Sequence, residues 1–299
     1  MKWIRRLFAG AILWRILGPA LAPRFKPPQE HPWRNPGRTV FVGDQEFLVR
    51  ELGPDGAKPI LLIHGLAGSS VAEWYRIGPA LAEKYKVIMV DHRSHGLSQL
   101  ARDRFDVEDV ADDIAGVLDE LGLGGVSIVG YSLGGAIAQA LAHRHPHRVE
   151  KLVLIATFTH HPPGWRVARS LGTVLVRAWE RLTGLGIPEA RTGYLLVTRA
   201  VEEKHARWLW EQTHRRDVEA GSQASFATFR FDSRPWIGRV EAPAKVIIPT
   251  KDQLVPPAWQ YELAAALRDP ELAEIVGARH EAPWTDPRRL VDEIADFVG

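Results

Sequence analysis

Short, almost entirely apolar runs alternate along this chain with amphipathic stretches of helical spacing. The runs are PILLIHG, KVIMVD, VSIVGYS, VEKLVLIA, AKVIIPT and AEIV. A strand can be apolar on both faces only when both faces are covered, and connecting helices provide that cover in a parallel sheet. The alternation therefore predicts an α/β fold with a mostly parallel, doubly wound sheet.

Two departures from this alternation predict the domain organisation. Residues 39–42 and 46–51 alternate around Gly43-Asp44 and so predict an antiparallel hairpin before the first apolar run. After about Phe158 the alternation stops until residue 244, and the segment between has helical periodicity and five of the eleven tryptophans. We therefore expect an N-terminal arm and linker at residues 1–38. The core would follow in two parts, at residues 39–157 and 241–299, with a helical cap inserted between them at residues 158–240.

Composition and charge exclude several classes of protein. The chain has no cysteine, which excludes disulfide scaffolds, cysteine nucleophiles and thiolate metal sites. Residues 1–40 carry eight Lys or Arg and one acid, Glu30, so this segment is +7 and the rest of the +2 chain is −5. The excess of basic residues therefore lies in the N-terminal arm, and we expect no nucleic-acid partner for the rest of the chain.

The arm, MKWIRRLFAGAILWRILGPALAP, leaves three alternatives open. Its longest early uncharged run, Leu7–Trp14, is too short to span a bilayer. As a helix it would place apolar residues opposite Lys2, Arg5 and Arg6, which suits peripheral membrane contact through residues 1–18. An amphipathic helix docked on the body and an exported signal are the other two alternatives. We expect a cytoplasmic protein, with export left open.

The most informative stretch is VGYSLGGAIAQAL, in which an apolar strand passes directly into an alanine-rich helix. The turn between them contains Gly130, Ser132 and Gly134 in a G-x-S-x-G pattern. Such a tight turn strains its central residue, and glycines on either side leave room for the neighbouring strand and helix. The strain would hold the Ser132 hydroxyl at the carboxyl edge of the sheet, where open α/β folds place their sites.

From about Thr39 to the C-terminus, the sequence resembles the α/β-hydrolase fold superfamily, in the branch of serine esterases and lipases with a helical cap. In this fold the catalytic residues follow the order serine, acid, histidine. Asp252 follows the run AKVIIPT, and PTKDQLVPP resembles the acid loop of the family. His280 is the only histidine beyond Asp252, and GARHEAPWTDP resembles the family's histidine loop. We therefore predict Ser132, His280 and Asp252 as the catalytic residues.

The resemblance also implies two backbone donors for the oxyanion of the reaction. One is the N–H of Leu133, directly after the nucleophile. The other is the N–H of Leu66 in LLIHGLAGSS, which is similar to the family's His-Gly-x motif. His64 would then orient this loop, and Gly65 would let its backbone approach the substrate.

Other polar motifs are given structural roles. DHRSHGLS (91–98) resembles a family loop that usually has glycine where this chain has Ser94. The adjacent acids Asp112 and Asp113 are expected on a solvated helix face. His160 and His161 follow a strand that points toward the predicted site and are candidates for substrate contact. With no dinucleotide, Walker, EF-hand or H-E-x-x-H motif, we predict no cofactor and no metal.

These observations predict a serine hydrolase that cleaves a carboxylic ester or a related acyl bond through an acyl-enzyme. The expected partner is a small acyl substrate, and the tryptophan-rich cap suggests an apolar or lipid-like one. Two alternatives stay open: another reaction on the same triad, such as thioester or C–C hydrolysis, perhydrolysis or acyl transfer, and a non-catalytic ligand receptor.

Overall fold

The computed structural model of the protein describes residues 36–66, 68–100, 104–183, 187–205, 208–209, 211–212 and 217–299. The predicted arm therefore lies almost entirely outside the described residues. Eight strands form one sheet in the order β1-β2-β4-β3-β5-β6-β7-β8. The strands are β1 (Arg38–Val42), β2 (Gln45–Leu52), β3 (Pro59–Ile63), β4 (Lys86–Asp91), β5 (Val126–Tyr131), β6 (Val149–Ile155), β7 (Ala244–Pro249) and β8 (Glu271–Ile275).

The strand directions confirm the predicted fold class. β1 and β2 pair antiparallel, β2 pairs antiparallel with β4, and every later pairing is parallel. Alternate residues of β3 enter opposite cores: Ile60 and Leu62 pack on one side of the sheet, Leu61 and Ile63 on the other. This burial on both faces explains why the strands are continuous apolar runs rather than alternating ones.

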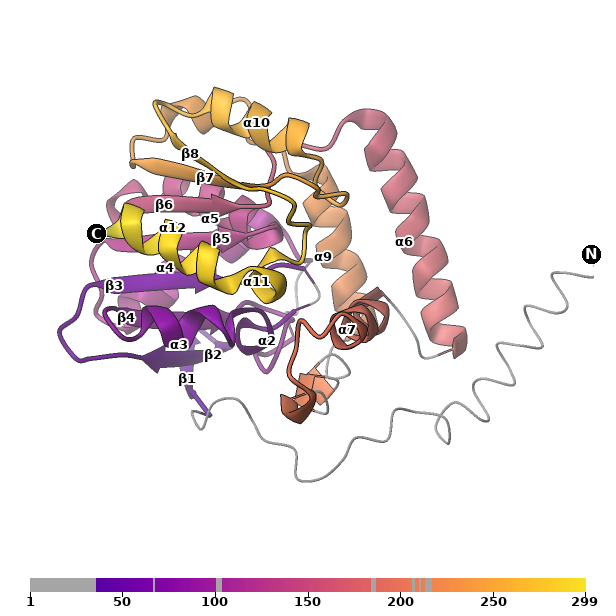
Figure 1. Ribbon diagram of the computed structural model, residues 1–299, viewed down its shortest axis with the longest axis horizontal. Coiled ribbons are helices and arrows are strands. Elements are labelled where there is room, and N and C mark those ends of the chain that lie inside the picture. Colours follow the sequence, from indigo (N-terminus) through magenta and orange to yellow (C-terminus); the bar gives the residue numbers. More distant parts are fainter. Residues whose placement is uncertain are drawn as a thin grey trace, which may run out of the picture.

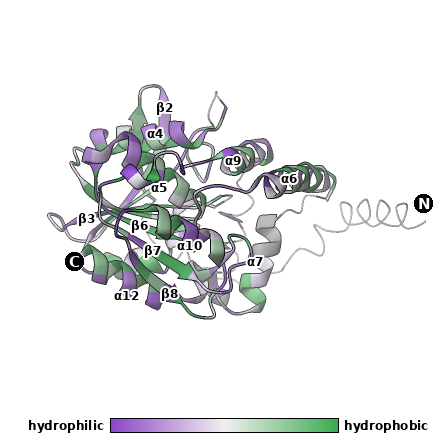
Figure 2. Cartoon of the chain, turned by 90° about the horizontal axis from the view of Figure 1, so that it is seen from above, coloured by the Kyte–Doolittle hydropathy of each residue, from purple (hydrophilic) through white to green (hydrophobic). Residues whose placement is uncertain are grey.

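Helices cover both faces of the sheet (Figure 1). On one side, α4 (Val107–Glu120) and α5 (Leu133–Arg144) pack together, and α10 (Pro257–Ala266) shares their core. On the other side, α3 (Ile77–Leu81) packs against α12 (Pro287–Val298), near the short helices α2 (Ser70–Trp74) and α11 (Ala282–Thr285). Figure 2 shows the hydrophobic central strands lying between these helices.

Between β6 and β7 the chain forms a group of helices at one end of the sheet (Figure 1). These helices are α6 (Pro163–Thr183), α7 (Ile187–Val197) and α9 (Val218–Arg230), with a short 3-10 turn at Glu203–His205. An isolated antiparallel bridge pairs His160 with Asp232, and the N–H of Ser233 donates to the carbonyl of Thr159 over 2.9 Å. The segment that contains these helices therefore begins and ends at neighbouring residues, near His160 and Asp232.

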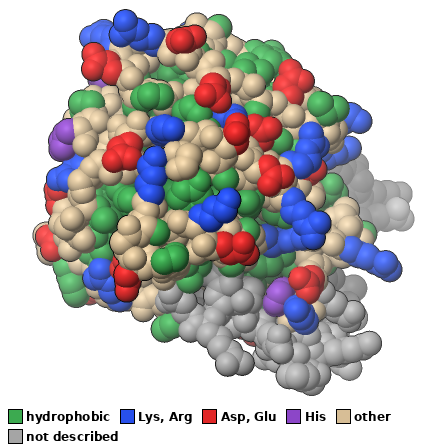
Figure 3. Space-filling view, turned by 60° about the vertical axis from the view of Figure 1, so that its left-hand side comes forward, with side chains coloured by type: hydrophobic (Ala, Val, Ile, Leu, Met, Phe, Trp, Pro, Cys, Tyr) green, Lys and Arg blue, Asp and Glu red, His purple; other side chains and the backbone are tan. Residues whose placement is uncertain are grey.

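Acidic and basic side chains are interspersed on the face of the molecule that Figure 3 shows. This mixture agrees with the small net charge of the body that the sequence implies.

Candidate active site

Ser132 is the single residue between the end of β5 and the start of α5. Its backbone has φ +53° and ψ −117°, in the left-handed region that side chains rarely adopt. Neighbouring groups hold it there: its N–H donates to the carbonyl of Ile155 over 2.9 Å, and the Thr157 hydroxyl donates to its carbonyl over 2.8 Å. Such strain persists only where the surroundings impose it, and it is concentrated at functional sites.

The glycines around Ser132 allow backbone to pack directly on backbone. A Cβ at Gly130 would lie 2.4 Å from the carbonyl oxygen of Gly134, and one at Gly134 would lie 2.2 Å from that of Ile63. A Cβ at Gly65 would lie 3.2 Å from the ring of Tyr131. The start of α5 is thus pressed against the end of β3, which brings the loop after β3 beside Ser132.

Replacing Gly134 by alanine is expected to destabilise the protein by about 1–3 kcal/mol or more, because an added methyl group there meets rigid backbone. The matched control is Gly221→Ala in α9, where a Cβ meets no atom within 4 Å. There alanine is expected to stabilise by about 0.5–1 kcal/mol, because it restricts the unfolded chain. Urea denaturation of both variants measures the contrast, and equal stability of the two would contradict the packing described.

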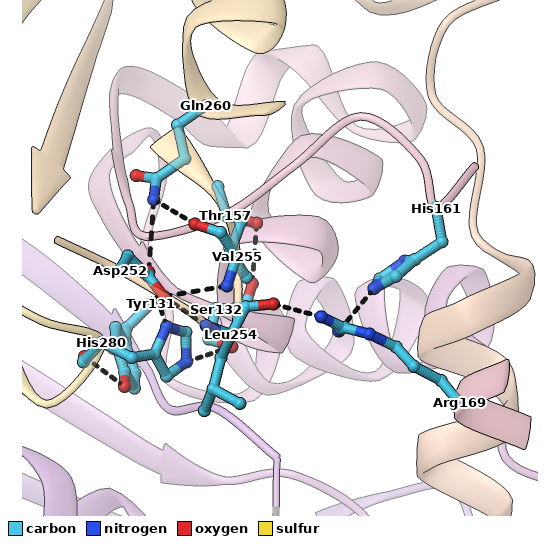
Figure 4. Close-up of polar contacts among 10 residues, drawn as sticks. All are labelled: Tyr131, Ser132, Thr157, His161, Arg169, Asp252, Leu254, Val255, Gln260 and His280. Carbon is cyan, nitrogen blue, oxygen red and sulfur yellow. Dashed lines mark hydrogen bonds and ion pairs between the residues drawn. The ribbon is translucent and has the colours of Figure 1, made fainter. Parts of the chain in front are cut away.

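The structure brings the three predicted catalytic side chains together, although they are far apart in sequence (Figure 4). Nε2 of His280 lies 3.1 Å from the hydroxyl oxygen of Ser132. Nδ1 of the same ring lies 2.8 Å from Oδ2 of Asp252. A carboxylate on Nδ1 favours the tautomer with its proton there, which leaves Nε2 free to accept the proton of the serine hydroxyl.

Asp252 has a side chain with no exposed surface, and it is surrounded by hydrogen-bond donors. Its Oδ1 accepts the N–H groups of Leu254 and Val255, both over 2.8 Å. Its Oδ2 accepts the amide of Gln260 over 3.2 Å, in addition to His280. These donors replace the water that burial removes, so a carboxylate is tolerated in this position.

Tyr131 and Gln260 are site residues that no sequence motif indicates. The Tyr131 hydroxyl donates to the carbonyl of His280 over 2.8 Å, and its ring centroid lies 5.1 Å from that of His280. Gln260 comes from α10, the helix after the loop of Asp252. Tyr131 is the variable residue before the nucleophile in G-x-S-x-G, so the motif alone contains no signal for it.

The two predicted oxyanion donors come from the start of α5 and from the loop after β3, which lies beside Ser132. Leu133 is the first residue of α5, so its N–H has no partner within the helix. The N–H of Gly65, next to Leu66, donates over 2.5 Å to the fully buried carboxylate of Glu73. This contact fixes the start of the loop that carries Leu66, and Leu66 and Leu133 stay predictions as oxyanion donors.

His64 is buried and bonded within the same loop. Its Nδ1 donates to the carbonyl of Gly65 over 2.9 Å, and its Nε2 accepts the N–H of His92 over 3.3 Å. The rings of His64 and His92 stack with centroids 3.8 Å apart, and His95 packs against His92 at 4.2 Å. Burial, reinforced by His64, lowers the pKa of His95 to about 3. Burial also lowers the pKa of His92 well below its usual value, so His92 and His95 are neutral packing elements behind the loop.

The loop after β4 is fixed by a buried ion pair and by one strained serine. Asp91 accepts both the N–H and the hydroxyl of Ser70, at 2.7 and 2.6 Å, and lies 3.4 Å from Nη1 of Arg50. Ser94 has φ +63°, which explains why the related motif usually has glycine at this position.

The expectation that Asp113 is solvated is wrong. Its side chain is buried against Arg93 of this loop, whose Nη2 donates to Oδ1 over 2.6 Å. Its neighbour Asp112 is only partly buried and pairs with Arg144 and His145, both over 2.7 Å. Adjacent helix residues point in different directions, so only one of the two acids faces the core.

Arg169 of α6 reaches from the helical segment to the loop of Asp252 (Figure 4). Its Nη2 donates to the carbonyl of Leu254, and its Nη1 donates to Nε2 of His161 over 3.1 Å. The guanidinium also lies over the rings of Trp165, Phe229 and Trp259. His161 is buried in this cluster, so it supports the wall of the site, and no motif in the sequence signals Arg169.

Between pH 7 and pH 5 the free energy of unfolding is expected to fall, in part because of His161. Burial, and next the charge of Arg169, lowers the pKa of His161 from 6.5 to about 3 in the folded protein. The unfolded chain therefore binds more protons between these values, so stability is present above pH 6.5 and is lost as the pH falls toward 3. One such histidine lowers the free energy of unfolding by about 2 kcal/mol when the pH falls from 7 to 5.

The variant His161→Gln keeps an acceptor for Arg169 but does not titrate. Urea denaturation at both pH values should show a smaller acid-induced loss for this variant than for the wild type. The exposed His147→Gln serves as the control and should behave like the wild type. An identical loss in all three proteins would contradict the assignment.

No group of three or more His, Asp or Glu side chains within the described ranges could hold a metal ion. Three alternating histidines, His143, His145 and His147, lie around the C-terminal end of α5. His143 stacks on Trp236 with centroids 4.5 Å apart, and His145 pairs with Asp112.

Comparison with known proteins agrees with this architecture. The family model for the alpha/beta hydrolase fold matches residues 58–181. The chain is 30% identical to pimeloyl-[acyl-carrier protein] methyl ester esterase of Neisseria meningitidis, over 83% of this chain and 79% of that protein. It is 29% identical to the putative carbamate hydrolase RutD of Caulobacter segnis, over 81% of this chain and 92% of that protein.

Solved structures give the same result. The enol-lactonase of Burkholderia xenovorans superposes with a TM-score of 0.73 at 25% identity, covering 87% of this chain and 99% of that one. A hydrolase from Pseudomonas aeruginosa superposes with a TM-score of 0.74 at 21% identity, covering 89% and 100%. With the sheet order and the strained serine turn already described, these similarities show that the chain belongs to the α/β hydrolase family.

Proposed function

We propose that this protein is a serine hydrolase that cleaves a carboxylic ester or a related acyl bond through an acyl-enzyme. The observation that supports this most is the unbroken series of contacts from Ser132 through His280 to Asp252, at 3.1 and 2.8 Å. A serine hydroxyl is a weak nucleophile unless a base within hydrogen-bond reach takes its proton, and that base must itself be oriented.

In this proposal the Ser132 oxygen attacks the carbonyl carbon while Nε2 of His280 takes the hydroxyl proton. The carboxylate of Asp252 stabilises the imidazolium that forms. His280 then donates the proton to the leaving group as the bond to the acyl carbon breaks. A water molecule, deprotonated by the same imidazole, attacks the acyl-enzyme and releases the acid.

The negative charge on the carbonyl oxygen would be stabilised by the N–H groups of Leu66 and Leu133. Removing one such donor typically costs about 10²–10³ in kcat. The buried contact between Gly65 and Glu73 supports this role, because it fixes the loop in which Leu66 lies before substrate arrives. Preorganised donors need no rearrangement in the transition state.

The substrate that we propose has an apolar acyl group. His161 and Arg169, beside the loop of Asp252, lie in an aromatic cluster that includes Trp165, Phe229 and Trp259. Arg169 is already bonded to His161 and Leu254, so its charge is partly satisfied within the protein. The relatives include a methyl ester esterase, a putative carbamate hydrolase and an enol-lactonase, which all act at a carbonyl carbon by their names.

A chain-length series of p-nitrophenyl esters tests the proposal, with a p-nitrophenyl carbamate and an acyl thioester as alternative acyl bonds. We expect turnover of the esters, with kcat/KM rising as the acyl chain lengthens. Product analysis with and without an acceptor alcohol distinguishes hydrolysis from acyl transfer. Turnover of the thioester or carbamate alone would overturn the ester assignment while keeping the triad, and turnover of none of these would favour a receptor.

A further inference from the structure

Helix α6 turns its apolar side chains outward. Along its length Val167, Leu171 and Leu175 are 71%, 60% and 63% exposed, and Val174 and Trp179 are also exposed. Val167, Leu171, Leu175 and Trp179 follow one another at intervals of four, and Val174 lies three positions after Leu171, so these residues share one side of the helix. We call them the outer face of α6. An exposed apolar stripe of this length on a globular protein indicates a surface that contacts another protein or a membrane.

The polar side of the same helix faces the protein. Arg169 reaches inward to Leu254, and Thr183 is buried. Arg177 and Arg181 form ion pairs with Glu219 of α9, the latter at 3.1 Å. A surface helix of a globular protein normally has the opposite orientation, with its apolar stripe toward the core. Figures 1 and 2 show α6 beside α9, at the edge of the molecule.

The outer face continues into a groove of about 560 Å³ between α6 and α9. Its apolar wall includes Val167, Leu171 and Val174 from α6, with Phe226 and Phe229 from α9. Arg166 and Arg230 also line the groove. The surface therefore combines apolar side chains with cations at one end, a combination typical of helices that lie on membranes.

The charges around this groove distinguish between its potential occupants. Both charged residues that line the groove, Arg166 and Arg230, are cations. The pKa of Arg230 is lowered by burial first and then by the charge of Arg104, while Asp106, at 4.0 Å, acts in the opposite direction. The N-terminal segment 1–40 is itself +7, so like charges disfavour its docking on this surface. A second copy of the chain would bring the same cations to the interface. An anionic lipid surface complements both the cations and the apolar side chains.

We propose that the outer face of α6 and its groove dock on the surface of an anionic lipid bilayer. None of the helices in the described ranges is long and apolar enough to cross a bilayer, so the contact is peripheral. Docking does not depend on the proposed reaction, because it is measured as binding.

The absence of cysteine from the chain gives a direct test of which surface docks. Val174→Cys on the outer face and Leu272→Cys on β8 replace side chains of similar exposure, 51% and 47%. Each full-length variant is labelled with an environment-sensitive nitrobenzoxadiazole group. Vesicles of equimolar phosphatidylcholine and phosphatidylglycerol should shift the emission of the Val174→Cys label to the blue and leave the Leu272→Cys label unchanged. An unchanged Val174→Cys label would overturn the proposal.

Vesicle flotation of unlabelled full-length protein measures the contribution of the outer face. The variant Leu171→Glu/Leu175→Glu should lose about tenfold or more in partitioning, because charges that anionic lipid repels replace two leucines that would enter the bilayer surface. The control Leu272→Glu/Val276→Glu changes two exposed apolar residues of the β8 region and should float like the wild type. Pure phosphatidylcholine and high salt should both weaken binding.

Two outcomes would contradict the proposal in distinct ways. Equal flotation of the wild type and Leu171→Glu/Leu175→Glu, together with loss of flotation in an arm variant Leu7→Glu/Phe8→Glu, would assign membrane contact to the arm alone. A blue shift of the Val174→Cys label that rises with protein concentration without vesicles would assign the outer face to self-association. Ester hydrolysis by each variant in the absence of vesicles shows whether the proposed reaction is retained.

Discussion

Replacing Ser132 by alanine is expected to lower kcat/KM for a p-nitrophenyl ester by about 10⁴-fold or more. The variant removes the attacking oxygen, while Gly130, Gly134 and the contacts of the strained turn stay in place. Residual rate above background would come from the oxyanion donors and substrate binding. Initial rates at several substrate concentrations, with near-ultraviolet circular dichroism as a check on folding, provide the measurement.

The variant His280→Ala should lose a similar factor, and the double variant should lose little more than either single one. Residues that act as a unit are strongly non-additive in this way. If the loss in the double variant were the product of the two single losses, Ser132 and His280 would act independently of each other. Turnover by Ser132→Ala at the wild-type rate would show that Ser132 is not the nucleophile.

The variant Asp252→Asn is expected to lower kcat by about 10⁴-fold with little change in overall structure. The new side chain would still accept the N–H groups of Leu254 and Val255 through its amide oxygen. Its amide nitrogen would then face Nδ1 of His280, and as a donor it would favour the wrong tautomer of the ring.

The matched control for Asp252 is Asp286→Asn, the nearest aspartate after His280 in the sequence. Asp286 accepts the hydroxyl of Thr285 and pairs with Arg289 at 3.8 Å, so it should be dispensable for turnover. If Asp286→Asn were the inactive variant and Asp252→Asn the active one, the acid would be assigned wrongly. The pH dependence of kcat in both variants gives an independent measurement of the tautomer effect.

The parts of the fold that sequence could predict are those set by local pattern and chain order. Burial on both faces makes β3 and β5 continuous apolar runs, and two glycines around Ser132 are needed where α5 presses on β3. Asp252 and His280 follow strands whose carboxyl ends meet at one edge of a parallel sheet. Their contacts with each other and with Ser132 therefore follow from topology.

Contacts that depend on how separate elements pack could not be predicted in this way. Gln260 reaches Asp252 from α10, and Arg169 reaches Leu254 from α6, although neither lies in a motif. The sequence indicated that Asp112 and Asp113 share a polar stretch of helix, but the position of Arg93 decides which of them is buried. Such contacts join residues of separate elements, and their formation depends on how these elements pack in the tertiary structure.

The outer face of α6 illustrates a second limit. The spacing of Leu171, Leu175 and Trp179 predicts one apolar side of a helix, and the structure has that helix. Periodicity does not say where that side points, because a stripe that faces the core and one that faces a partner have the same spacing. The contacts of Arg169 with Leu254 and of Arg177 with Glu219 show the orientation.

Covalent labelling with a fluorophosphonate tests most directly whether Ser132 is an activated nucleophile. Peptide mass spectrometry should locate a single phosphonyl adduct on Ser132 in the wild type, no adduct in Ser132→Ala and much slower labelling in His280→Ala. An adduct on another residue, or equal rates of labelling in the wild type and His280→Ala, would contradict activation of this hydroxyl by the imidazole beside it.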